Sequence, residues 1–271
     1  GGISSSGTLT VANTTFSGNT VSNNGGGIYN SGTATITNVT FTGGYAGASG
    51  GLFNSGTATV TNSIFDDIDS LENCQGPIIN GGGNWSDDGW CVFEPERMYV
   101  DVRVNPSLAN NGGPTLTHAL LTGSPALGTG NAAACAAAPV NNVDQRGFAR
   151  PNPVGEDCDS GAFESSFPKP AAQNYVVNSL ADPGDGTCDV TNCTLREAIT
   201  AANTNAGITD TITFSVTGTI NLSANLPAIS DNITITGPGT ANLIINGADS
   251  YLPFAINSSV SASINALTIR N

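Results

Sequence analysis

Few side chains in this sequence could carry out acid–base chemistry, and the first of them form a cluster. Asp66, Asp67 and Asp69 stand close together, and paired carboxylates are what hydrolysis of a glycosidic bond needs. Such a pair must face each other across a groove, however, and these three follow one predicted strand as a short turn. A solvated acidic turn is therefore the favoured interpretation.

Two other kinds of catalytic site find little support. His118 is the only histidine, and no serine and aspartate can be assigned to it as a triad, so it is interpreted as a packing or hydrogen-bonding residue. A polysaccharide lyase would need a basic residue beside carboxylates that hold calcium, and residues 1–65 contain neither. We nominate no catalytic residue and expect that the chain is not an enzyme.

Asp182, Asp185 and Asp189 are the candidate metal ligands. They surround a Pro-Gly-Asp-Gly turn at 183–186, and oxygen ligands at alternating turn positions suit Ca²⁺. An ordinary Asp/Gly-rich turn explains the same residues and is favoured. We therefore expect no cofactor, with calcium as the alternative.

The six cysteines lie in three local pairs: Cys74 and Cys91, Cys135 and Cys158, and Cys188 and Cys193. Neither a Cys-x-x-Cys pair nor a nearby histidine suggests a zinc site. The pairs predict three disulfides and an oxidising, extracellular or cell-surface compartment.

Charge limits the partners of this 271-residue chain. Seven Lys and Arg against 21 Asp and Glu give a formal net charge of −14, which disfavours nucleic acid and anionic membranes. No charged side chain precedes Asp66, so the first 65 residues must be buried, stacked or glycosylated to stay in solution. No apolar run is long enough to span a bilayer. The N-terminus lacks a basic region, so we expect either that a signal peptide has been removed or that the sequence belongs to something longer.

An internal repeat predicts the architecture. A Gly-Ile/Leu-x-x-Ser-Gly-Thr anchor begins at Gly2, Gly27 and Gly51, with spacings of 25 and 24 residues. Each anchor is followed by alternating small or apolar residues and threonines, as in a half-buried strand. Such periods predict a right-handed parallel β-helix, a solenoid whose coils stack about 4.8 Å apart. Equivalent positions then form two ladders: Asn13, Asn38 and Asn62 at a turn, and Phe16, Phe41 and Phe65 inside.

The same strand texture returns in 206–271, at Ile233-Thr234-Ile235, Leu243-Ile244-Ile245 and Ala266–Asn271. Because roughly 140 residues of different character separate the two β-rich pieces, a single solenoid running continuously in sequence order is not expected.

The intervening segment contains several motifs in a fixed order. They are 110–121 (NNGGPTLTHALL), 123–126 (GSPA), 144–147 (DQRG) and 159–164 (DSGAFE). This segment resembles the C-terminal region of bacterial surface β-helix proteins called choice-of-anchor Q. Residues 188–198 (CDVTNCTLREA) are similar to the CSLREA motif at the N-terminus of the same kind of protein, with Thr194 at the family's serine position. Thr194 and Glu197 also form a capping-box pattern ahead of a short apolar stripe, which predicts a helix that caps a solenoid end.

The motifs occur in circularly permuted order relative to that family. The predicted layout is 1–68 β-helix coils, 69–165 choice-of-anchor-Q-like closing region, 166–173 linker, 174–205 CSLREA-like cap and 206–271 β-helix coils. We hypothesise that 174–271 of one copy and 1–165 of the next complete one solenoid, covalently or by strand stacking. The predicted interface comprises Gly1, Gly2, Ile3, Leu9, Val11, Leu267, Ile269 and Asn271.

The function expected from this pattern is that of a structural subunit in an extracellular fibre or sheath, with other copies of itself as partner. The alternative is a cell-surface adhesin or glycan-binding protein, because a flat Thr/Asn/Ser face with Tyr29 and Tyr45 could contact glycans. A polysaccharide lyase or hydrolase is the least favoured class.

Overall fold

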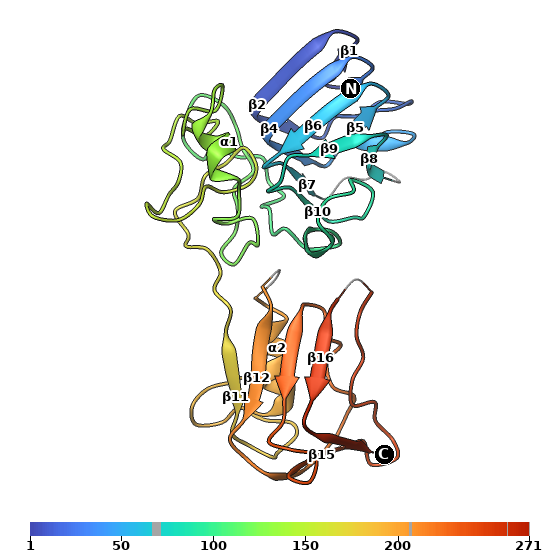
Figure 1. Ribbon diagram of the computed structural model, residues 1–271, viewed down its shortest axis with the longest axis vertical. Helices are drawn as coiled ribbons and strands as arrows, with labels where there is room; N and C mark the ends of the chain where they lie inside the picture. The colour runs from blue at the N-terminus through green and yellow to red at the C-terminus, as the bar shows by residue number, and fades with distance from the viewer. Residues whose placement is uncertain (67–71, 206–207, 259, 271) are drawn as a thin grey trace. The chain divides into compact units, whose positions relative to one another are not determined.

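A computed structural model describes residues 1–66, 72–205, 208–258 and 260–270. The chain divides into two compact units, Gly1–Pro170 and Ala171–Asn271, and their boundary falls within the predicted linker. Each unit contains stacked, parallel-paired strands (Figure 1), which confirms the predicted parallel β-helix class.

Unit 1 is a solenoid of stacked coils. One sheet has the order β1-β3-β5-β8, with β1 Ile3–Ser5, β3 Ile28–Asn30, β5 Ser49–Asn54 and β8 Glu72–Gln75. The other contains β2 Thr8–Ser17, β4 Thr33–Thr42, β6 Thr57–Thr61, β7 Ile64–Asp66, β9 Ile78–Asn80 and β10 Trp85–Ser86. Pairing is parallel and in the register of the sequence repeat, for example Ile3↔Ile28 and Ile28↔Leu52.

The asparagines that the repeat aligns form the corner of each coil. Asn13, Asn38 and Asn62 have φ of 47°, 54° and 50°, the left-handed region that asparagine tolerates better than most residues. The chain therefore changes direction there without leaving the stack. A second pair, Asn30 and Asn54, lies at the preceding corner, where Asn30 Nδ2 donates to Asn54 Oδ1 at 2.7 Å.

A column of phenylalanines fills the interior of unit 1. The ring centroids of Phe16 and Phe41 are 4.8 Å apart and those of Phe41 and Phe65 are 4.5 Å apart, with nearly parallel planes. The backbone passes close to these rings: a Cβ on Gly27 would meet Phe41 Cδ1 at 2.7 Å. A Cβ on Gly2 would likewise meet Phe16 Cδ1 at 3.0 Å, so the ring column favours glycine at the start of these two anchors.

The solenoid extends beyond residue 68, the predicted end of its coils. β8 pairs with β5, β9 with β6 and β10 with β7, so a fourth coil is added. The Cys74–Cys91 disulfide joins this coil to the following loop, and Phe93 adds a tilted fourth ring 5.8 Å from Phe65. The remainder of unit 1 is mostly irregular, with a 3-10 turn at Pro95–Arg97 and the short helix α1, Ala132–Ala136.

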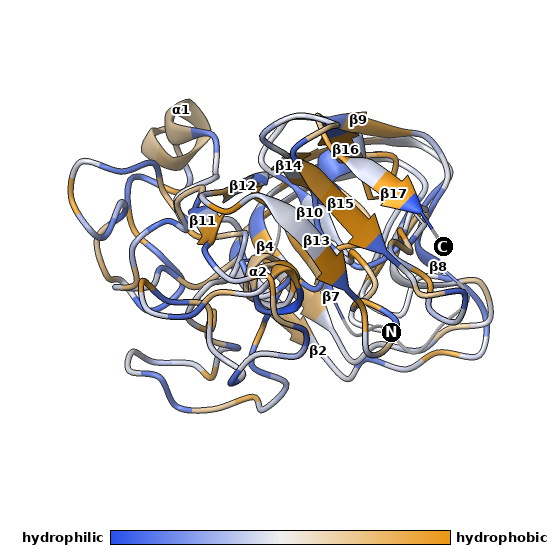
Figure 2. Ribbon diagram, turned by 90° about the horizontal axis from the view of Figure 1, so that it is seen from below, coloured by the Kyte–Doolittle hydropathy of each residue, from blue (hydrophilic) through white to orange (hydrophobic). Residues whose placement is uncertain are grey.

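Unit 2 contains two smaller parallel sheets. The first has the order β11-β12-β14-β16, with β11 Asn174–Val177, β12 Asp210–Phe214, β14 Ile233–Thr236 and β16 Ala262–Asn265. The second has the order β13-β15-β17, with β13 Gly218–Asn221, β15 Leu243–Asn246 and β17 Thr268–Arg270. Figure 2 shows β15 in the colours of hydrophobic residues, and Leu243 and Ile245 are fully buried.

The helix α2, Leu195–Ala202, packs against β11 and β12. Thr194 and Glu197 form a complete capping box at its N-terminus, as the sequence pattern predicted. Leu195, Ala198 and Ile199 turn toward the core and are buried with Val177. The helix therefore covers the β11 side of unit 2.

Truncation of the central ring should destabilise unit 1. Phe41 is 1% exposed and stacks on a ring on each side. We expect Phe41→Ala to lower the free energy of unfolding by about 3–5 kcal/mol, measured by urea denaturation and circular dichroism. Phe167→Ala is the matched control, since Phe167 is 40% exposed. Equal losses in the two variants would contradict a stability role for the column.

Candidate functional site

The first candidate surface is the edge of unit 1 formed by β1 and β2. Both strands lie at the edge of their sheets among the described residues. Val11 is 6% exposed and Ile3 and Leu9 are half-buried, whereas Ile28 and Ile36, one coil further on, are fully buried. The predicted interface residues Gly1 and Gly2 lie at the same edge and are exposed. Among the described residues, no further coil covers the apolar interior at this edge.

The second candidate surface is the β16–β17 edge of unit 2. β16 pairs with β14 and β17 with β15, and neither strand has a partner on its other side among the described residues. Leu267 is half-buried and Ile269 is 51% exposed, although the preceding coil buries Leu243 and Ile245 completely. Asn271, which the sequence also placed at this interface, lies outside the described residues.

The two edges share a local design. A two-residue connection joins β1 to β2, and another joins β16 to β17. In each case the second strand points an aliphatic side chain, Leu9 or Ile269, into the solenoid, and the neighbouring coil pairs with it in parallel. Each edge can therefore accept a further parallel strand.

The closing region of unit 1 binds the asparagine corners. Asn13 Nδ2 donates to the Val143 carbonyl at 2.9 Å, and the Asn131 N–H donates to Asn62 Oδ1 at 2.6 Å. Asn38 Nδ2 donates to the carbonyls of Asp159 and Gly161. The ladder amides are therefore bonded to residues that lie 69 to 130 positions further along the chain.

Arg150 is buried at the centre of this closing region. Its guanidinium donates to the carbonyls of Asp159 and Gly161 at 2.9 and 2.7 Å, the same two oxygens that Asn38 reaches. It also pairs with Glu164 at 2.7 Å. The Arg150 guanidinium thus connects several groups within the 159–164 motif. It shares two carbonyl acceptors with Asn38, and these carbonyls connect the motif to the solenoid.

A second arginine supports the 144–147 motif. Arg146 pairs with Asp144, and its guanidinium carbon lies 3.7 Å from the centroid of Phe163 and 4.5 Å from that of Phe148. Gln145 accepts a hydrogen bond from Thr15 Oγ1 on β2 at 2.6 Å. The motif residues therefore hold the closing region together and attach it to the coils.

His118 is also a docking residue. It is 3% exposed, with Nε2 at 2.9 Å from Ser17 Oγ and Nδ1 at 2.7 Å from the Asn105 carbonyl. Both ring nitrogens thus have partners within the fold. Of the predicted acidic turn, Asp66 ends β7 and is 9% exposed, whereas Asp67 and Asp69 lie outside the described residues.

The candidate calcium ligands have partners within the chain. Asp182 pairs with Arg196 at 2.7 Å and accepts from Ser223, Asp185 accepts from the Thr187 N–H, and Asp189 accepts from Thr191 and Asn192. Among the described residues, no three His, Cys, Asp or Glu side chains are grouped to hold a metal ion. Calcium binding by these residues stays a prediction.

The three predicted disulfides are confirmed: Cys74–Cys91, Cys135–Cys158 and Cys188–Cys193. The Cys135–Cys158 pair lies against the corner amides of Asn38 and Asn62. No helix among the described residues is long and apolar enough to span a membrane. Comparisons with protein-family models, curated proteins and solved structures find no match to this chain.

Burial changes the acid–base behaviour of the closing region. Desolvation raises the pKa of Asp159 to about 8, and the neighbouring Glu164 adds to the rise, although N–H groups of Ser165 and Gly128 donate to the carboxylate. Desolvation also raises the pKa of Glu164, against the attraction of Arg150. The folded chain therefore holds a proton at Asp159 that the unfolded chain releases near pH 4.

We predict that stability falls as pH rises from about 4 to about 8, because the folded state binds more protons than the unfolded state across this window. Thermal unfolding followed by circular dichroism should give a lower Tm at pH 9 than at pH 5. Asp159→Asn should reduce this difference, and Asp157→Asn, at an exposed neighbour, should preserve it. An unchanged pH dependence in Asp159→Asn would contradict the assignment.

We also predict that EDTA leaves the Tm unchanged, because Asp182 is neutralised by Arg196 and Asp189 is bonded within its own turn. The measurement is thermal unfolding with and without the chelator in calcium-free buffer. The Asp182→Asn variant serves as the positive control for destabilisation, since it leaves Arg196 without its anionic partner. A clear fall of Tm on adding EDTA would favour the calcium site instead.

Proposed function

We propose that this chain is a structural subunit of an extracellular fibre or sheath, assembled head to tail through its solenoid edges. The observation that carries the proposal is the pair of open apolar coils, β1–β2 in unit 1 and β16–β17 in unit 2. A coil of one copy stacked on a coil of the next would bury Leu9 and Ile269 and pair the free strand edges.

The two surfaces differ from each other, so their contact is heterologous. A heterologous contact that does not close into a ring generates an open filament. Within each unit, successive coils already show the required geometry, with parallel strands in register and apolar side chains directly above one another. The same packing would then continue from copy to copy.

The composition of the edges supports pairing. Natural edge strands are usually protected by charged side chains, proline or bulges. β1 and β2 contain no charged residue, and Arg270 is the only one in β16 and β17. Edge strands of this composition are suited to pairing with a strand of another copy.

The disulfides and the resemblance to choice-of-anchor Q proteins support a location outside the cell. A structural role, not a catalytic one, is proposed because the arginines and buried carboxylates of the closing region bind one another and the solenoid backbone. The ionisable side chains of the closing region thus stabilise the fold.

We expect the purified chain 1–271 to form fibres visible by electron microscopy and sedimenting at high speed. Leu9→Lys should abolish them, because it places a charge inside the contact. The matched control is Thr10→Lys, one residue further along β2, where the side chain is exposed. Both variants are checked for folding by circular dichroism.

Mixing separates end-to-end assembly from general aggregation. A Leu9→Lys chain keeps its β16–β17 edge, so it should add to one fibre end and stop growth there, shortening wild-type fibres at substoichiometric ratios. The Leu9→Lys/Ile269→Lys double variant should have no such effect. Size-exclusion chromatography in denaturant, with disulfides intact, should show a single monomer if stacking is non-covalent. A wild-type chain that stays monomeric at every concentration tested overturns the proposal.

A further inference from the structure

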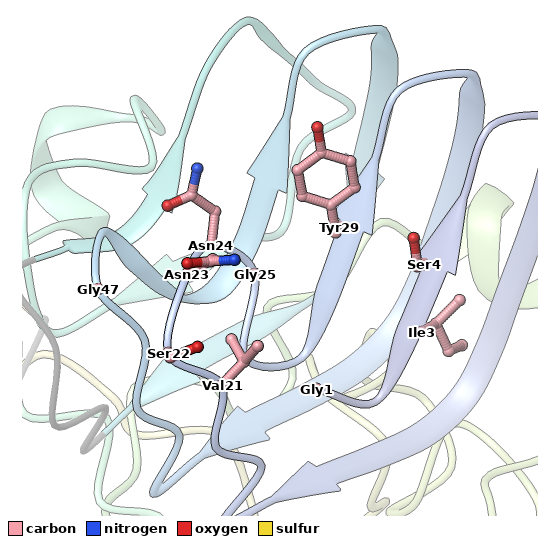
Figure 3. Close-up of a pocket in the computed structure, with 10 residues that line it drawn as sticks. All are labelled: Gly1, Ile3, Ser4, Val21, Ser22, Asn23, Asn24, Gly25, Tyr29 and Gly47. Atoms are coloured by element: carbon pink, nitrogen blue, oxygen red, sulfur yellow. The ribbon is translucent and has the colours of Figure 1, made fainter.

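A groove of about 770 Å³ opens beside the first two coils of unit 1. One wall is the outer face of β1 and β3, with Ser4 and Tyr29, and the other is the loop at 21–25 (Figure 3). The groove is lined by Gly1, Ile3, Ser4, Val21, Ser22, Asn23, Asn24, Gly25, Tyr29 and Gly47. None of these side chains is charged, although the protein has a net charge of −14.

Tyr29 presents an aromatic platform within the groove. On one side its ring stacks on Phe53, with centroids 5.2 Å apart and planes 5° from parallel. On the other side the register places Ser4 directly opposite Tyr29. The β1 coil supplies Ser4 at the position where the β5 coil supplies the Phe53 ring. The face of the Tyr29 ring on the β1 side therefore has no aromatic neighbour, which leaves a slot about one ring thick beside Ser4.

The opposite wall supplies hydrogen-bonding groups. Ser22 and Asn23 are exposed and Asn24 is half-buried, and no hydrogen bond to another described residue engages their side chains or the Tyr29 hydroxyl. The loop itself is held in place, because the Val21 N–H donates to Tyr45 O at 3.0 Å and the Gly47 N–H donates to Asn23 O at 2.6 Å. Its amides are thus free to bind a ligand yet fixed in position.

A flat ring face beside amides and hydroxyls matches the chemistry of a sugar. The C–H groups on one face of a pyranose carry partial positive charge and pack against the electron-rich face of an aromatic ring. Asn side chains offer both donors and acceptors to adjacent hydroxyls. From this geometry we propose that the groove binds a neutral saccharide, with one pyranose ring stacked on Tyr29 in the slot above Ser4 and its hydroxyls bonded to Asn23 and Asn24.

The charge of the protein selects neutral sugars over acidic ones. No cationic side chain in the groove would compensate a uronate or sulfate, the α-ammonium of Gly1 already donates to the Thr20 carbonyl at 3.1 Å, and the overall negative charge of the protein repels acidic sugars. Tyr45, which is 51% exposed, does not line the groove and serves as an external reference. The proposed sugar contacts lie on the outward face of β1 and β3 and on the loop at 21–25, whereas Gly1 and Ile3, which also line the groove, belong to the proposed fibre edge.

The test titrates the chain with cellohexaose, maltohexaose, chitohexaose and mannohexaose by calorimetry, with hexagalacturonate as the anionic comparison. We expect at least one neutral hexasaccharide to bind and hexagalacturonate to bind at least tenfold more weakly. Tyr29→Ala should weaken binding at least tenfold, Tyr29→Phe should retain it within a few-fold, and Tyr45→Ala should leave it unchanged.

A second variant tests the slot without removing any contact of the fold. Ser4→Phe should extend the Phe53–Tyr29 stack by one ring, occupy the slot and abolish binding, with the Tm unchanged or raised. Absence of binding by all four neutral sugars overturns the proposal, as does full affinity in Tyr29→Ala or Ser4→Phe. Electron microscopy of the same variants should still show fibres wherever the wild type forms them, so the two proposals can fail separately.

Discussion

The left-handed turn at Asn13, Asn38 and Asn62 is the constraint on which unit 1 depends. Each coil must change direction while keeping its strands stacked, and one residue with φ near 50° achieves this. Asparagine tolerates that backbone, but in the two inner coils its amide is completely buried and must find partners. Those partners are carbonyls of the closing region. The asparagines that the backbone turn requires therefore also bind the closing region to the solenoid.

That docking explains how a segment with little regular secondary structure stays folded. The carbonyls of Asp159 and Gly161 each accept two hydrogen bonds. One comes from Asn38 of the solenoid, and the other comes from Arg150 of the closing region. Burying a guanidinium is costly unless it is fully bonded, and Glu164 supplies the compensating charge. The Cys135–Cys158 disulfide lies against the same amides. The closing region is therefore organised around the corner it covers.

Periodic features of the sequence predicted much of the fold. Contacts that do not follow the repeat could not be predicted from its spacing. Strand register and the stacking of Phe41 follow from spacing alone, and the Thr194–Glu197 capping box is a local pattern. The fourth coil lacks the glycine anchor, and Cys74 occupies the position of Leu52, so its membership in the solenoid was not visible. The contacts of Asn38 with Gly161 and the slot above Tyr29 depend on which coils and loops become neighbours, which composition and spacing do not encode.

Among the described residues, each unit has one covered and one uncovered edge, and this contrast supports the proposed assembly. In unit 1, Phe93 and Met98 close the core beside the fourth coil, whereas β1 and β2 leave theirs open. In unit 2, α2 packs on the β11 side, whereas β16 and β17 carry no cover among the described residues. Inward aliphatic side chains and nearly uncharged strands at those edges favour strand pairing with another coil over exposure to water.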